Sequence, residues 1–160
     1  MTAPAAQVVA FETDGISFLP PPAWTWDVVV TFHAEPNKSA QPLTIQVARE
    51  PLTAGDSFRL YSQRKLVQAA TRADIEILET TTRNVGGRSA VLWRSRMKVD
   101  AGTFVQTLVI VDPGSDLDRR VTLFSAVVPE QQDAQGRAAL EELLATVRFD
   151  VAGRAGRAVR

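Results

Sequence analysis

Residues 88–128 read RSAVLWRSRMKVDAGTFVQTLVIVDPGSDLDRRVTLFSAVV, and this stretch decides the fold. It contains three segments rich in β-branched and aromatic residues, namely Arg88–Val99, Thr103–Val111 and Arg119–Val128. Two short polar connections separate them, Asp100-Ala101-Gly102 and residues 112–118. Segments of this composition with short connections predict consecutive antiparallel strands.

The same pattern continues on the N-terminal side of this stretch. Asp74–Val85 leads into Arg88–Val99 through Gly86-Gly87, a pair typical of two-residue hairpin turns. Asp14-Gly15 is a second hairpin signal. Four further strands are therefore predicted, at Val8–Phe11, Ile16–Leu19, Asp27–His33 and Leu43–Arg49.

Two segments carry helical periodicity instead. The first is predicted to begin at an N-cap on Asp56 and to end near Arg72, with an apolar stripe of Phe58, Tyr61, Leu66 and Ala69. The second is predicted over Ala134 to Val147, with an apolar face of Leu140, Leu143, Leu144 and Val147. We therefore predict an α+β fold, in which an antiparallel β-sheet of about six or seven strands has two helices packed on one face.

The chain has the length of one compact domain, at 160 residues. Residues 8–149 are predicted to form a single α+β domain, since no internal linker or repeat is visible. Residues 1–7 and 150–160 are small and lack periodicity, so they are predicted to be flexible termini.

Three of the predicted strands are apolar on both faces: Asp27–His33, Thr103–Val111 and Arg119–Val128. Arg88–Val99 instead alternates apolar and polar residues, as expected for a sheet covered on one side. If both helices cover one face, a subunit, a ligand or a polypeptide client must cover the other. The alternative is that loops and the N-terminal hairpin close over that face.

Gln106 stands among apolar neighbours on its strand, between Phe104 and Leu108. A buried amide without hydrogen-bond partners costs roughly 1–3 kcal/mol. A neighbouring strand could satisfy it, or the amide could be offered to a bound partner.

The composition excludes several function classes. The chain has no cysteine, so disulfides, thiolate catalysis and Cys-based metal sites are ruled out. Lys plus Arg and Asp plus Glu are both 18, and this balance argues against nucleic-acid binding. No run approaches the roughly 18 apolar residues of a membrane span, and no signal peptide is recognisable, so we expect a soluble cytoplasmic protein with no stable membrane insertion.

The sequence contains no catalytic motif. A nucleophile elbow and a phosphate-binding glycine loop are both absent, and His33 is the only histidine. The acidic loop with Asp112, Asp116 and Asp118 lacks the spacing of a calcium-binding EF-hand. We therefore expect a protein that is not an enzyme and that needs no cofactor or metal.

Six sequence runs, taken in order, resemble the DcrB-related family. They are F-x-x-D-G-I-S-F-L-P-P-P-A-W (Phe11–Trp24), V-A-R-E-P-L (Val47–Leu52), G-D-S-F-R-L-Y-S-Q-R-K-L (Gly55–Leu66), G-G-R-S-A (Gly86–Ala90), F-V-Q-T-L (Phe104–Leu108) and L-L-A-T-V-R-F (Leu143–Phe149). The best understood members are the effector-associated (Eag) chaperones of bacterial type VI secretion. The resemblance extends over nearly the whole predicted domain.

This resemblance implies a Mog1/PsbP-like fold, a homodimer and a chaperone function. Relatives of the Eag type shield the apolar N-terminal transmembrane helices of PAAR- or Rhs-type effectors before export. The client-binding residues it implies are Val28 and Val30 on an early strand, and Gln106 with its neighbours Phe104 and Leu108 on a later one. A second family glutamine, in the first helix, is replaced here by Lys65, with Gln63 nearby but out of register. A binding or regulatory module of the same fold with another protein partner is the alternative.

Overall fold

The computed structural model describes residues 9–11, 16–18, 29–33, 43–114 and 119–149. Eight strands, one short 3-10 helix and two α-helices lie in these ranges. The strands are β1 (Val9–Phe11), β2 (Ile16–Phe18), β3 (Val29–His33), β4 (Thr44–Pro51), β5 (Ile75–Val85), β6 (Arg88–Val99), β7 (Gly102–Val111) and β8 (Arg120–Pro129). The helices are α1 (Phe58–Ala70), the 3-10 helix η1 (Glu130–Gln132) and α2 (Asp133–Thr146). The predicted flexible termini, 1–7 and 150–160, lie outside the described residues.

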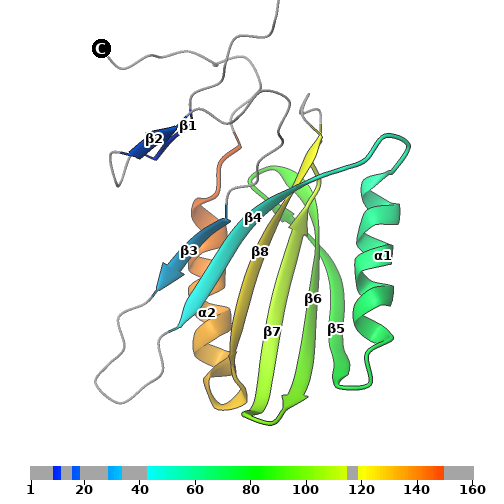
Figure 1. Cartoon of the computed structure of the whole chain (residues 1–160), viewed down its shortest axis with the longest axis vertical. Coiled ribbons are helices and arrows are strands. Elements are labelled where there is room, and N and C mark those ends of the chain that lie inside the picture. Colours follow the sequence, from blue (N-terminus) through cyan, green and yellow to red (C-terminus); the bar gives the residue numbers. More distant parts are fainter. Residues whose placement is uncertain (1–8, 12–15, 19–28, 34–42, 115–118, 150–160) are drawn as a thin grey trace, which may run out of the picture.

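Six of the strands form one antiparallel sheet in the order β3-β4-β8-β7-β6-β5 (Figure 1). β1 and β2 pair with each other in a separate two-stranded sheet. The prediction of an α+β fold with an antiparallel sheet of about six or seven strands and two helices is confirmed.

The β5–β6 hairpin forms where Gly86-Gly87 predicts it, whereas the predicted turn at Asp14-Gly15 lies outside the described residues. β5 ends at Val85 and β6 begins at Arg88, so Gly86 and Gly87 alone make the turn, with φ of 56° and 83°. Positive φ at both central positions is the geometry of a type I′ turn, whose twist matches that of the flanking strands. A side chain at position 86 would also collide with Phe149, whose Cδ2 would lie 2.9 Å from the added Cβ.

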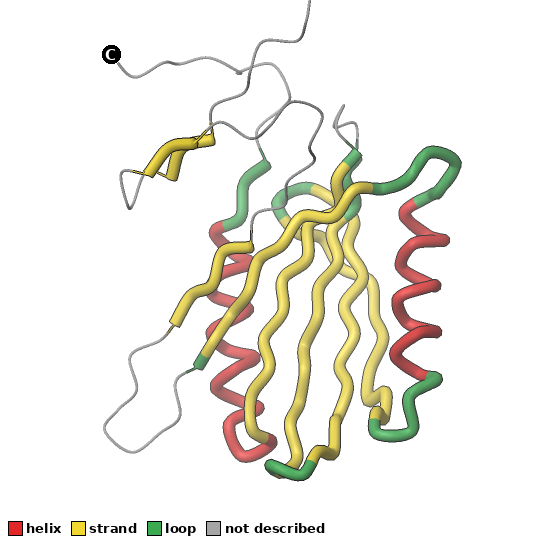
Figure 2. The backbone as a smooth tube through the Cα atoms, viewed as in Figure 1, coloured by secondary structure: helices red, strands yellow, loops and turns green. Residues whose placement is uncertain are grey.

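The two helices pack on opposite faces of the sheet, so the prediction that both pack on one face is wrong. On β7, Leu108 and Ile110 belong to a core cluster with Tyr61 of α1, whereas Val109 and Val111 belong to a second cluster with Leu140 of α2. Successive residues of a strand point to opposite faces, so these clusters lie on opposite sides of the sheet. Figure 2 shows the two helices flanking the sheet.

This arrangement explains why several strands are apolar on both sides. The central strands β6, β7 and β8 contribute buried residues to the α1-side core cluster on one face and to the α2-side cluster on the other, so much of their apolar surface is covered by helices of the same chain. The expectation that a whole sheet face stands free is therefore corrected to a smaller region, described below.

The polar side of β6 faces α2 and η1 rather than solvent. Arg94 pairs with Asp133 at the start of α2. Arg96 Nε donates to Glu130 of η1 at 2.8 Å, and Arg83 of β5 makes two hydrogen bonds to Glu141 of α2 at 2.5 and 2.8 Å. These charged pairs fix the position of α2 across the strands, in addition to its apolar contacts.

The helix boundaries differ slightly from those predicted. The N-cap of α1 is Ser57, not Asp56, because Ser57 Oγ accepts the backbone N–H of Leu60 at 3.2 Å. The carboxylate of Asp56 instead accepts hydrogen bonds from Thr53 and Arg64. The first helix ends at Ala70 and the second ends at Thr146, within a few residues of the predicted ends.

Candidate functional site

Among the described residues, no helix covers the α1-side surface of the sheet over β3, β4, β8 and the start of β7. We call this region the open face. Its described members are Val29, Thr31, Gln46, Ala48, Phe104, Gln106, Ser125 and Val127. Val29 is 57% exposed and Val127 is 42% exposed, and both are large apolar side chains. Figure 1 shows α1 beside β5, at the opposite end of the sheet from β3.

Strand register identifies the members of the open face. Val29 is paired with Ala48, and Ala48 is paired with Leu123, a residue of the α1-side core cluster. Residues paired across antiparallel strands share a face, so Val29 belongs to the α1 side. The face mixes aliphatic and aromatic side chains with three amide or hydroxyl residues, Gln46, Gln106 and Ser125.

Gln106 makes a hydrogen bond across the strands. Its Nε2 donates to Ser125 Oγ on β8 at 3.1 Å, and the side chain is half-buried. Among the residues the structure describes, Ser125 is its only recorded side-chain partner. The neighbouring strand therefore satisfies part of the amide, and no hydrogen bond to its carbonyl oxygen is present among the described residues.

A cleft of about 210 Å³ separates α1 from β4 at the border of the open face. It is lined by Glu50, Tyr61, Arg64, Lys65 and Gln68. Tyr61 donates its hydroxyl to Glu50, and Lys65 Nζ lies 2.9 Å from Glu50 Oε2. The Lys65 ammonium also lies 5.5 Å from the centre of the Tyr61 ring.

These contacts shift two pKa values. Burial alone would raise the pKa of Glu50, but the hydrogen bonds from Tyr61 and Lys65 outweigh it and hold that pKa below its usual range. Burial, and then the hydrogen bond to Glu50, raise the pKa of the Tyr61 hydroxyl. The cleft is therefore bordered at neutral pH by an ionised Glu50 carboxylate and a neutral Tyr61 phenol.

The five predicted client-binding residues do not form one surface. Val28 lies outside the described residues. The register pairs Val30 with Val47, which packs with the α2-side cluster, so this strand position belongs to the face opposite Gln106. Leu108 is only 7% exposed and lies in the core with Trp93 and Tyr61 beneath α1, which corrects its expected exposure to a client.

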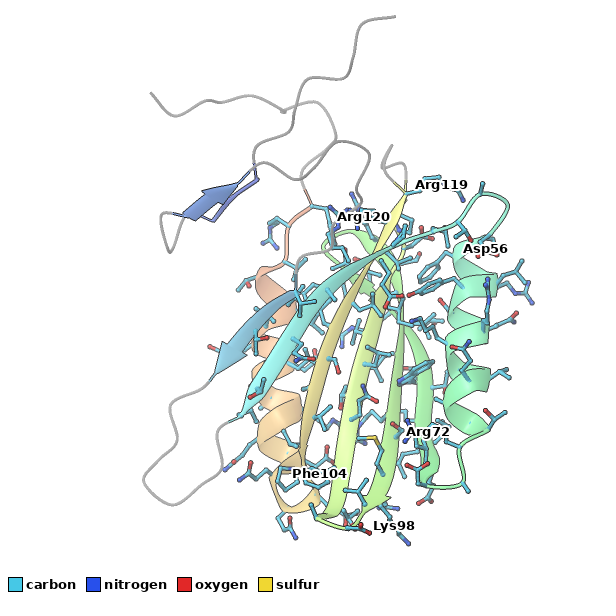
Figure 3. The ribbon with its side chains drawn as sticks, viewed as in Figure 1. Asp56, Arg72, Lys98, Phe104, Arg119 and Arg120 are labelled. Carbon is cyan, nitrogen blue, oxygen red and sulfur yellow. The ribbon has the colours of Figure 1, made fainter. Side chains whose placement is uncertain are left out.

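Phe104 and Gln106 do lie on the open face. Both are half-buried, and Phe104 lies near the β6–β7 hairpin, at the end of the sheet where Figure 3 also shows Lys98. The cross-strand partner of Phe104 on β8 is Pro129, and that of Gln106 is Val127.

The sequence analysis missed Val29, Gln46 and Val127. A strand with apolar residues on both faces does not show which of its faces lies on the α1 side. The choice of Val30 over Val29 therefore rested on the family resemblance alone. The pairing β3-β4-β8 supplies the missing information, because it ties the register of β3 to a strand whose two faces are both identified.

Lys65 and Gln63 leave α1 on different sides. Lys65 lines the cleft beside the open face, together with Gln68, whereas Gln63 lines a larger cleft toward β5. Lys65 therefore lies at the border of the open face, and Gln63 does not compensate for it there.

The described residues give no indication of a metal site, since no three His, Cys, Asp or Glu side chains among them come together. No helix in the described ranges is both long and apolar enough to cross a membrane.

The fold has a counterpart among solved structures. PA94 of Pseudomonas aeruginosa, a protein of unknown function considered a candidate regulator, superposes with a TM-score of 0.75 over 91% of this chain and 98% of its own, at 14% sequence identity. At this identity the likeness shows a shared fold and nothing about activity.

A second match is CyanoP, the cyanobacterial PsbP of Synechocystis. It has a TM-score of 0.46 at 12% identity, over 87% of this chain and 88% of its own, which is too weak a similarity to support an argument about the fold. No family model matches the chain. No curated protein matches it significantly either.

Proposed function

We propose that this protein is a non-enzymatic chaperone or adaptor that binds apolar helices on its open face. The client we propose is the apolar N-terminal transmembrane region of a type VI secretion effector of the PAAR or Rhs type. The chaperone would hold this region in the cytoplasm before export. It would act as a homodimer of Mog1/PsbP-like subunits of the DcrB-related family. The observation that carries the proposal is the combination of exposed Val29 and Val127 with the amides of Gln46 and Gln106 on one sheet surface.

This combination suits an apolar helix that has polar groups within it. Burial of apolar surface contributes about 25 cal/mol per Å², so contact with Val29, Val127 and Phe104 favours binding. Transmembrane helices that pack together carry serine, threonine or amide groups, which are costly to bury unmatched. Gln106 offers such a group a hydrogen-bond partner inside an apolar surface.

A co-purification experiment tests the proposal. Proteins captured by the tagged chain from its source cells are identified by mass spectrometry, and the captured effector is expected to carry paired apolar N-terminal segments ahead of a spike-tip domain. That N-terminal region is then co-expressed with the wild-type chain and with variants.

Two substitutions address the open face. Val29→Asp is expected to abolish capture, and Gln106→Ala is expected to weaken it while leaving the melting temperature nearly unchanged. Leu60→Asp is the matched control, because Leu60 is 53% exposed but lies on the outer side of α1. Undiminished capture by both open-face variants would remove the site assignment, and the absence of any client with apolar N-terminal segments would overturn the function.

The alternative is a regulatory binding module that recognises a different protein partner. The description of PA94 as a candidate regulator favours it, since that protein has the same fold. A captured partner without apolar segments, still dependent on Val29, would support this alternative.

A further inference from the structure

A second cleft lies on the other side of α1, between this helix and β5. The connection from α1 to β5 is short, so the two run antiparallel side by side (Figure 2). The cleft has a volume of about 680 Å³. Its apolar lining comes from Phe58, Leu66 and Val91, and its β5 side is formed by Thr80, Thr81 and Thr82.

β5 is an edge strand in the sheet that the described residues form. An edge strand carries a row of backbone N–H and C=O groups with no strand to pair them, and native proteins guard such edges with bulges and charges. A bulge between Ile77 and Glu79 protects the first half of β5, and Arg83 adds a charge near its end. The exposed threonines between them, 80–82, have neither a charge nor a proline.

Two polar groups of α1 at this cleft have no partner within the described ranges. Ser62 is 6% exposed, and its hydroxyl has no hydrogen bond among the described residues. Arg59 is exposed, and no ion pair is recorded for it in the part of the chain that the structure describes, whereas Arg64 on the opposite flank pairs with Asp56 at 2.7 Å. The cleft thus joins an apolar lining to a cation that attracts a carboxylate.

We propose that an extended peptide segment of a partner protein binds here as an added strand on β5. Its backbone pairs with residues 80–84, alternate apolar side chains enter the cleft against Phe58, Leu66 and Val91, and a carboxylate meets Arg59. This is β-strand addition, in which backbone hydrogen bonds supply affinity and side-chain pockets supply specificity. A second copy of the chain is a poorer occupant, because its own β5 would bring Thr80 and Thr82 to an apolar lining.

This site is separate from the open face, since the two lie on opposite flanks of α1. The proposal therefore does not depend on the chaperone function, and each can fail without the other.

A peptide selection tests the strand-addition site. A displayed library of short random peptides is selected against the folded chain, and an enriched peptide is synthesised with a fluorescent label. We expect alternating apolar positions with an acidic residue or a free C-terminal carboxylate. Binding is measured by fluorescence anisotropy, and backbone amide shifts of residues 80–84 are followed by NMR.

Matched variants locate the binding. Arg59→Glu is expected to weaken binding at least about tenfold, as for loss of one charge-assisted hydrogen bond, and Thr82→Arg is expected to block the cleft. Lys98→Glu and Thr31→Arg are the controls, at the far end of β6 and on the other edge strand, and should bind as the wild type does.

Three outcomes would overturn the proposal. The first is that no peptide is enriched. The second is that neither cleft variant reduces peptide binding, or that the peptide shifts the NMR signals of open-face amides instead of those of residues 80–84. The third is self-association of the chain, measured by ultracentrifugation, that Thr82→Arg abolishes, since a second copy would then occupy β5.

Discussion

Glu50 is the residue that links α1 most directly to the edge of the open face. It accepts hydrogen bonds from Tyr61 and Lys65, which lie one helical turn apart on α1. A single carboxylate on β4 therefore ties a helix flank to the sheet. The sequence shows Glu50 only as an acidic residue near the end of a strand, because its partners follow 11 and 15 positions later and meet it through the fold.

The stability of the protein should depend on the ionisation of Glu50. Its pKa is lower in the folded state than its ordinary value of 4.5, so the stabilisation is present above that pH and is lost as the pH falls through the lowered pKa. We expect Glu50→Gln to reduce the free energy of unfolding at neutral pH and to flatten its decline on the acid side of about pH 4.5. Urea unfolding at a series of pH values measures this.

Glu142→Gln is the control for that profile, because Glu142 is an exposed glutamate on α2 with no recorded partner in the described ranges. Its free energy of unfolding should fall at acid pH in the same way as that of the wild type. If Glu50→Gln showed the same decline at acid pH as the wild type, the Tyr61–Glu50–Lys65 contacts would contribute nothing measurable to stability.

Gly136 determines how closely α2 can approach β8. A Cβ added at this position would lie 3.0 Å from both Cγ atoms of Val128, a residue that is buried. From the sequence alone, a glycine in the first turn of a helix is only an unfavourable residue for helix formation. The structure gives the reason for a glycine there, since helix and strand meet at this point.

A double-mutant cycle tests this contact. Gly136→Ala should destabilise the protein by about 1–3 kcal/mol through overpacking, despite the better helix propensity of alanine. In a Val128→Ala background, where the obstructing methyl groups are gone, the same change should be neutral or stabilising. Free energies of unfolding from urea titrations give the coupling, and additive effects would contradict the close approach.

At the scale of the molecule, the described core is a six-stranded antiparallel sheet between two helices of the same chain. Leu140 of α2 is 1% exposed within the cluster on one face, and Tyr61 of α1 belongs to the cluster on the other. The apolar residues on both sides of β7 and β8 are thus used mainly inside the protomer. In the described ranges, the part of the α1 side that extends beyond the helices is the open face on β3, β4, β8 and the start of β7.

Two leucines on the helices should differ widely in their contribution to stability. Leu140→Ala should cost about 2–5 kcal/mol, because it leaves a cavity between α2 and the sheet. Leu60→Ala, at an exposed position of α1, should change the free energy of unfolding by no more than about 0.5 kcal/mol. Thermal and urea unfolding compare the two, and similar losses would argue against the observed orientation of α1.

The sequence by itself determined the strands, their hairpins and the two helices. These depend on local signals: the alternation of side chains, the Gly86-Gly87 turn and the apolar stripes of the helices. Residues close in the chain supply those contacts, so their pattern is visible without a structure.

Only the tertiary structure decided which face each helix covers, and with it the site. The apolar stripe of a helix must pack against an apolar surface. Strands such as β7 offer such a surface on each face of the sheet, so the stripe alone does not determine which face the helix covers. The choice arises where distant segments meet, as Tyr61 meets Glu50 and Leu140 meets the opposite side of β7. For the same reason, only the strand register across β4 and β8 shows that Val29 is the residue of β3 that lies on the open face.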